Sequence, residues 1–147
     1  MLFDTHCHLD VSAFDADRSE VAARAHLAGV ESVLVPGCQA SEWATLLQVC
    51  ENVSAPHLFP ALGLHPCYSE QHEELHLRWL EQYLQERPDI VAVGEIGLDF
   101  YLPALKEQAV KEKQGYFFKQ QLQIAQQFNK PVILHIRKAH QEVLHCL

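Results

Sequence analysis

The sequence opens with two histidines at a spacing that suits a metal ion. His6 and His8 stand two residues apart at the end of the first stretch that is typical of a β-strand. Alternate residues of a strand project from the same face, so both imidazoles can point at one place. The alternative is that the two are ordinary polar residues of an N-terminal loop. Further candidate ligands along the chain decide between these interpretations.

Three such candidates follow later apolar stretches. They are His65, Glu95 and His135, and each comes where a predicted strand ends. The carboxyl ends of parallel strands meet at one edge of a sheet, where β/α folds collect their chemistry. Glu95 indicates a site most strongly, because a carboxylate that closes an apolar strand is poorly solvated without a partner. His65 taken alone is equally typical of a hydrogen-bonded loop residue.

The pattern between these residues predicts an α/β fold. Short apolar runs alternate with amphipathic helical segments, as a parallel sheet covered by helices requires. The helices are expected up to Gly29, from Ser41, around Leu80, through Phe128 and from Ala139 to Leu147. The strands after the first are expected at 30–35, 58–64, 90–95 and 131–135, with a turn over 96–99. The length of 147 residues fits one domain, residues 1–147.

The candidate residues together suggest metal-assisted hydrolysis. Three imidazoles and a carboxylate suit Zn²⁺ or Mn²⁺, and Mg²⁺ if water fills the remaining positions. A carboxylate between histidine-bound ions can bridge two of them, and such a pair activates water and stabilises charge on a phosphoryl or carbonyl oxygen. Glu95 is therefore the expected catalytic residue. The sequence contains no G-x-S-x-G elbow and no glycine-rich phosphate loop.

Composition excludes several other classes. The formal net charge of −8 argues against a protein that binds nucleic acid mainly by counterion release. No apolar run approaches the roughly 20 residues that a membrane span needs, so we expect a cytoplasmic protein without membrane contact. Five cysteines without a C-x-x-C motif indicate neither a disulfide framework nor a zinc knuckle.

Two further features are interpreted as structural. Cys7 is interpreted as a packing residue, and the pair His72 and His76 as part of a solvated helix face.

Four linked motifs resemble those of the TatD-type deoxyribonucleases. They cover residues 3–10, 61–66 and 93–99 and the stretch from Gln120 to Arg137. The resemblance implies a TIM-type (β/α)₈ barrel and hydrolysis of phosphodiester bonds in DNA, commonly from the 3′ end, or in a small phosphoester. It implies two divalent ions, Mg, Mn or Zn, with the first held by His6 and His8. Glu95 would bridge to a second ion on His135, and His65 and Arg137 would lie close to the substrate phosphate.

The family pattern also has a histidine on the sixth strand and an aspartate on the eighth, both beyond Leu147. The sequence accordingly predicts about the first five β/α units of the barrel, a truncated barrel. We expect these 147 residues alone to be weakly stable and inactive, with no stable protein partner.

Three alternatives remain open at this stage. A binuclear amidohydrolase acting on another ester or amide also uses H-x-H on its first strand, although a lysine rather than Glu95 would favour it. A polymerase-and-histidinol-phosphatase type of domain opens in the same way, but it usually continues with a Ser-Asp-Gly turn that is absent after His8. The third is a non-catalytic fragment that keeps partial metal affinity.

Overall fold

Five parallel strands form one curved sheet in the computed structural model, which describes residues 1–147. Each strand pairs with the strand that follows it in the chain, so the order is β1-β2-β3-β4-β5. The sheet therefore advances in one direction, like part of the wall of a barrel. The strands are β1 (Leu2–Asp4), β2 (Val30–Pro36), β3 (His57–Leu62), β4 (Ala92–Asp99) and β5 (Val132–Arg137).

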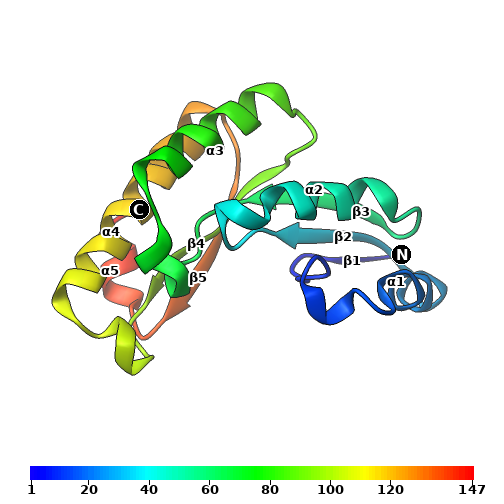
Figure 1. The fold of residues 1–147 in the computed structure, drawn as a ribbon, viewed down its shortest axis with the longest axis horizontal. Coiled ribbons are helices and arrows are strands. Elements are labelled where there is room, and N and C mark those ends of the chain that lie inside the picture. Colours follow the sequence, from blue (N-terminus) through cyan, green and yellow to red (C-terminus); the bar gives the residue numbers. More distant parts are fainter.

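Helices connect the successive strands and pack against them. In Figure 1, α2 runs beside β2 and β3, and α3 and α4 run beside one another on the side of β4 and β5. None of the helices combines the length and the apolar character that crossing a bilayer would need. The helices are α1 (Arg18–Leu27), α2 (Trp43–Asn52), α3 (Glu74–Glu86), α4 (Gln108–Gln127) and α5 (His140–Leu144). The alternation of strands and helices confirms the predicted α/β class.

The core lies between the sheet and these helices. It is built from the apolar stripes that the helices turn inward and from the strand residues that face them. Trp43 of α2 is fully buried, and its indole N–H donates to the carbonyl oxygen of Gly63 at 3.2 Å. Strand β4 is buried along its whole length, so every polar residue that it carries needs a partner inside the protein.

Strands β1 and β4 end furthest from where they were expected. Strand β1 stops at Asp4, whose carboxylate accepts the His6 N–H at 3.1 Å. His6 and His8 therefore lie in the loop after the strand, and strand alternation is not what aligns them. Strand β4 continues past Glu95 to Asp99, because its pairing with β5 extends to Arg137. The predicted turn over residues 96–99 is therefore wrong.

Two buried glutamines of α4 connect this helix to the site-bearing edge of the sheet. Gln121 accepts the Leu64 N–H at 2.7 Å and donates to the Leu64 carbonyl at 3.3 Å. Gln114 accepts the Asp99 N–H at 2.9 Å and donates to the Asp99 carbonyl at 3.1 Å. Each glutamine amide satisfies both the N–H and the carbonyl of one residue, as a neighbouring strand would do. Helix α4 therefore sets the backbone positions of Leu64, next to His65, and of Asp99.

Candidate metal centre

Four histidines from three separate parts of the chain surround the carboxylate of Glu95. Its Oε2 lies 3.1 Å from Nε2 of His6 and 3.3 Å from Nε2 of His8. Its Oε1 lies 2.9 Å from Nδ1 of His135 and 3.5 Å from Nε2 of His65. Glu95 is 6% exposed, so these imidazoles replace most of the water that would otherwise solvate its charge. The sheet thus brings together five of the six residues predicted for the site.

Arg137 is the sixth predicted residue, and it lies apart from the carboxylate. It is the last residue of β5 and is exposed. Its guanidinium stacks on the ring of Tyr101, 3.9 Å from the ring centroid. Its charge is thus held at the same sheet edge without contacting Glu95.

The ring nitrogens of His8 have distinct roles. Nδ1 lies 3.1 Å from the carbonyl oxygen of Pro36, which can only accept a hydrogen bond. In the neutral imidazole the proton is therefore on Nδ1, and Nε2 presents a lone pair to the centre, 3.2 Å from Nε2 of His6. A backbone carbonyl that orients a histidine in this way is typical of metal sites.

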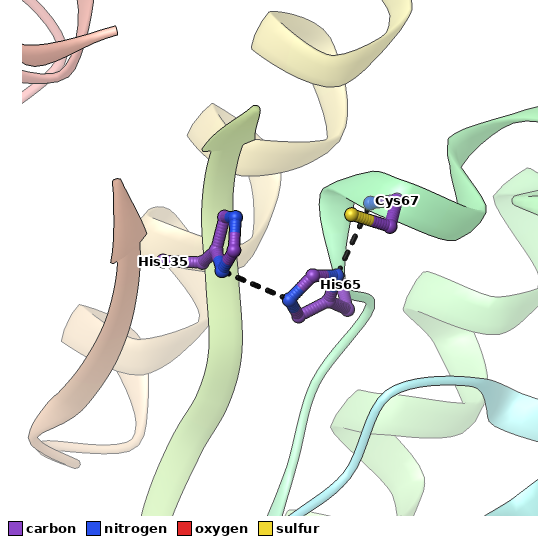
Figure 2. Close-up of side chains that lie close together, drawn as sticks. All are labelled: His65, Cys67 and His135. Carbon is purple, nitrogen blue, oxygen red and sulfur yellow. Dashed lines mark hydrogen bonds between the residues drawn. The ribbon is translucent and has the colours of Figure 1, made fainter. Parts of the chain in front are cut away.

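His65 has the opposite arrangement. Figure 2 shows its ring between His135 and Cys67, and its Nδ1 accepts the backbone N–H of Cys67 at 3.1 Å. In the neutral imidazole the proton is therefore on Nε2, which points toward Nδ1 of His135 at 3.1 Å. His65 thus presents a donor to the centre, whereas His8 presents an acceptor.

Electrostatics keep the central carboxylate ionised. Burial alone raises the pKa of Glu95, but hydrogen bonds donated by His135, His65 and His8, the first and last in their imidazolium forms, outweigh it and hold this pKa well below its usual range. The pKa of His8 is raised to about 10, first by the Cys38 thiol near Nδ1 and then by Glu95. Glu95 is also the main cause of the raised pKa of His135. The centre is a buried negative charge whose positive partners are imidazoles alone.

This donor set fits a divalent cation. The contacts of Glu95 include no lysine and no arginine, so only imidazoles stand against its charge. His6, His8 and Glu95 present ligand atoms that all lie within 4.8 Å of one another. Nitrogen and carboxylate oxygen in this proportion match the preferences of Zn²⁺ and Mn²⁺.

Two residues near the centre were not predicted as site residues. Asp99 is fully buried, and its Oδ2 lies 3.0 Å from Nε2 of His135. Its position four residues after Glu95, on the same face of β4, is the sequence signal that could have identified it. Cys67 forms with His65 and His135 a second group whose ligand atoms lie within 4.8 Å of one another. Nothing in the spacing of Cys67 distinguishes it from a packing cysteine.

The interpretation of His72 as a solvated residue is wrong. His72 is 4% exposed, its Nε2–H donates to the carbonyl oxygen of His65 at 3.0 Å, and its ring packs edge-on against Phe117. The reason is that Pro66–Gln71 forms a short 3₁₀ helix that packs on α4 and carries His72 inward ahead of α3. His72 therefore supports the loop that holds His65.

We expect His72 to make stability depend on pH. Burial lowers its pKa to about 4, and the nearby charges of His76, Lys113 and His65 act in the same direction. Below its unfolded pKa of about 6.5 the unfolded chain binds a proton that the folded chain excludes, so stability falls by about 3 kcal/mol as the pH falls to about 4. Urea unfolding of His72→Gln, which keeps a donor without titrating, should show a smaller loss than the wild type. His145→Gln, at an exposed histidine, is the control, and an unchanged pH dependence in His72→Gln would contradict the expectation.

Comparison with known proteins gives a consistent match over nearly the whole chain. Residues 3–147 match the family model described as TatD related DNase. The chain is 40% identical over 141 residues to the uncharacterized metal-dependent hydrolase YjjV of Escherichia coli K12, covering 95% of this chain and 52% of YjjV. It is 34% identical over 143 residues to the 3′-5′ ssDNA/RNA exonuclease TatD of Salmonella typhimurium, covering 97% and 52%.

Two solved structures also match nearly all of this chain and about half of their own length. The crystal structure of YjjV, a TatD homologue from E. coli K12, superimposes with a TM-score of 0.88 at 39% identity, over 98% of this chain and 54% of that chain. A TatD family hydrolase from Entamoeba histolytica, at 21% identity and a TM-score of 0.81, shares the fold. The chain spans about half the length of the relatives that it matches, and its five β/α units confirm the architecture expected from the sequence.

Proposed function

The chain belongs to the TatD related DNase family, and from this premise we propose that it binds divalent cations around Glu95 and uses this centre to hydrolyse phosphodiester bonds. The observation that carries the proposal is one buried carboxylate with three histidines, His6, His8 and His135, within 3.3 Å of its oxygens. The activity is proposed for the whole protein, since the matched relatives are about twice as long as this chain.

The residues divide between two cation positions. His6, His8 and Glu95 would hold one cation, and Glu95 and His135 would hold a second, with Glu95 bridging. A divalent cation in such a donor set makes water more acidic and stabilises negative charge on a phosphoryl oxygen. Because the pKa of Glu95 is so low, its carboxylate is available as a ligand throughout the neutral pH range.

His65 and Arg137 would act on the phosphate rather than on a cation. His65 directs the N–H of Nε2 at the centre, because Cys67 occupies its other ring nitrogen. A phosphate oxygen beside Glu95 can accept this hydrogen bond. Arg137 remains charged at neutral pH and is held over Tyr101, so it adds a cationic group at the outer side of the site.

The proposed substrate is single-stranded nucleic acid. The Salmonella relative carries the name of an ssDNA/RNA exonuclease. The side chains of His6 and His8 are partly exposed, so a phosphate group can approach the centre from this side. With a net charge of −8, the protein has to hold that phosphate by local groups and cations.

Metal uptake tests the proposal directly. Calorimetric titration of Zn²⁺ or Mn²⁺ into the metal-free chain should show specific binding. His6→Ala should lower the affinity at least about tenfold. The reason is that loss of a residue that only hydrogen-bonds to a metal ligand already costs roughly 10- to 100-fold, and a ligand contributes more. His145→Ala, at an exposed histidine of the C-terminal segment, is the matched control. A wild-type chain without specific uptake would contradict the proposal and favour a non-catalytic fragment.

Hydrolysis is measured as the release of nucleotides from a single-stranded oligonucleotide with added Mg²⁺ or Mn²⁺. The expectation that these 147 residues alone are inactive stays a prediction, and this assay tests it. Metal-dependent release that disappears in Glu95→Gln would overturn that expectation and support the proposed reaction. Release that persists in Glu95→Gln would place the activity elsewhere.

A further inference from the structure

Asp99 is fully buried, and both oxygens of its carboxylate have hydrogen-bond partners within the protein. Its Oδ1 accepts the backbone N–H of Tyr101 at 2.9 Å. Its Oδ2 lies 3.0 Å from Nε2 of His135 and 3.6 Å from the thiol of Cys67, which donates to it. An ionised carboxylate can only accept, so the proton between Asp99 and His135 belongs to Nε2 of the imidazole.

This contact decides which nitrogen of His135 faces the centre. A neutral imidazole carries one proton, and with that proton on Nε2 its Nδ1 presents a lone pair. Nδ1 lies 2.9 Å from Oε1 of Glu95, so in the imidazolium form it donates to that oxygen, and a cation would take the place of this proton. Without Asp99, Glu95 would be the only carboxylate competing for the proton. Nδ1 would then carry it, and it could not bind a cation.

Strand β4 supplies both carboxylates that flank this one imidazole. Glu95 and Asp99 are four residues apart and project from the same face of the strand, so they reach opposite sides of the His135 ring. The backbone of Asp99 is held at both its N–H and its carbonyl by Gln114 of α4. The position of Asp99 is therefore set by α4, although Asp99 lies outside the group of His6, His8 and Glu95.

We propose that Asp99 is a positioning residue for the metal centre, which holds the Nε2 proton of His135 so that Nδ1 is the ligand atom. The inference rests on the proposed function, because it treats His135 as a cation ligand. Carboxylates in this outer position fix the tautomer and the ring orientation of metal-binding histidines.

Zn²⁺ titration of Asp99→Asn tests the inference. Both carboxylate oxygens of Asp99 accept hydrogen bonds, whereas asparagine offers one oxygen and cannot satisfy His135 and the Tyr101 N–H together. We expect the variant to bind the cation at His135 about 10- to 100-fold more weakly and to leave the position at His6 and His8 unchanged. Asp17→Asn, the same change at an exposed residue, controls for the loss of one charge.

A spectroscopic measurement separates positioning from a general loss of structure. In the Zn²⁺-loaded wild type, ¹⁵N-resolved NMR of the His135 ring should show the proton on Nε2 and a metal-bound Nδ1, and in Asp99→Asn this signature should weaken or disappear. The backbone amide spectrum of Asp99→Asn should otherwise match that of the wild type, so the lost signature would not reflect a loss of structure.

The outcomes distinguish this inference from the proposed function. Absence of Zn²⁺ uptake by the wild type would overturn the proposed function, and the inference with it. Normal uptake by the wild type with equal affinity in Asp99→Asn, or a proton found on Nδ1 of His135, would overturn the inference alone. Widespread changes in the backbone amide spectrum of Asp99→Asn would also overturn it, because a loss of structure would then explain the effect.

Discussion

Replacing Glu95 with glutamine is expected to lower the affinity of the chain for Zn²⁺ or Mn²⁺ by at least about 100-fold. Both carboxylate oxygens of Glu95 face imidazoles, Oε2 toward His6 and His8 and Oε1 toward His135, so one side chain serves both proposed cation positions. Glutamine has nearly the same shape but no charge and only one acceptor oxygen. Since the loss of a mere outer partner costs roughly 10- to 100-fold, the loss of a shared ligand should exceed that range.

The measurement is thermal unfolding with and without metal. At a free cation concentration of about 100 times Kd, binding should stabilise the wild type by about 2.7 kcal/mol, and Glu95→Gln should gain almost nothing. Glu20→Gln, at an exposed position of α1, should gain as much as the wild type. Equal stabilisation of Glu95→Gln and the wild type would show that the cation binds away from Glu95.

Gly97→Ala is expected to destabilise the protein by about 3–5 kcal/mol, because backbone strain and overpacking add in the same direction. Gly97 lies in β4 opposite His135 of β5, and its φ of +144° is a conformation that residues with a side chain rarely adopt. A Cβ at this position would also overlap the backbone carbonyl oxygen of His135, so the two strands would have to separate. Both effects act on the strand that carries Glu95.

Gly115→Ala is the matched control for this substitution. Gly115 lies inside α4, and a Cβ there would have no atom within 4 Å. The same chemical change should therefore stabilise the protein by about 0.5–1 kcal/mol through helix propensity. Urea unfolding measures both variants. A Gly97→Ala variant as stable as the wild type would mean that β4 and β5 do not approach as closely as the structure shows.

Much of the fold follows from the pattern of apolar residues. Apolar runs such as 58–64 and 90–94 supply the buried parallel strands β3 and β4, and the helical stripes between the strands pack on the sheet, because burial of these surfaces is the main driving force. The ends of the elements are less predictable. Strand β4 runs on to Asp99 only because β5 supplies partners for its backbone, and such partners are not visible in the local sequence.

The candidate site was likewise predictable in its residue types but not in all of its contacts. The types and order of His6, His8, Glu95 and His135 are enough to indicate a metal centre, and folding brings the three imidazoles within hydrogen-bond distance of one carboxylate. Their ligand roles stay predictions until metal uptake is measured. The burial of His72 was not predictable, because its neighbour Phe117 comes from a helix some forty residues later.

The sequence by itself determined the α/β class, the family motifs and the kinds of donor atoms that are available, because these depend on residue type and spacing. The tertiary structure decided which nitrogen of each histidine faces the centre. That choice depends on single contacts between distant segments: the Pro36 carbonyl at His8, the Asp99 carboxylate at His135 and the Cys67 N–H at His65. A proton on a ring nitrogen follows its hydrogen-bond partner, and only folding brings these partners together.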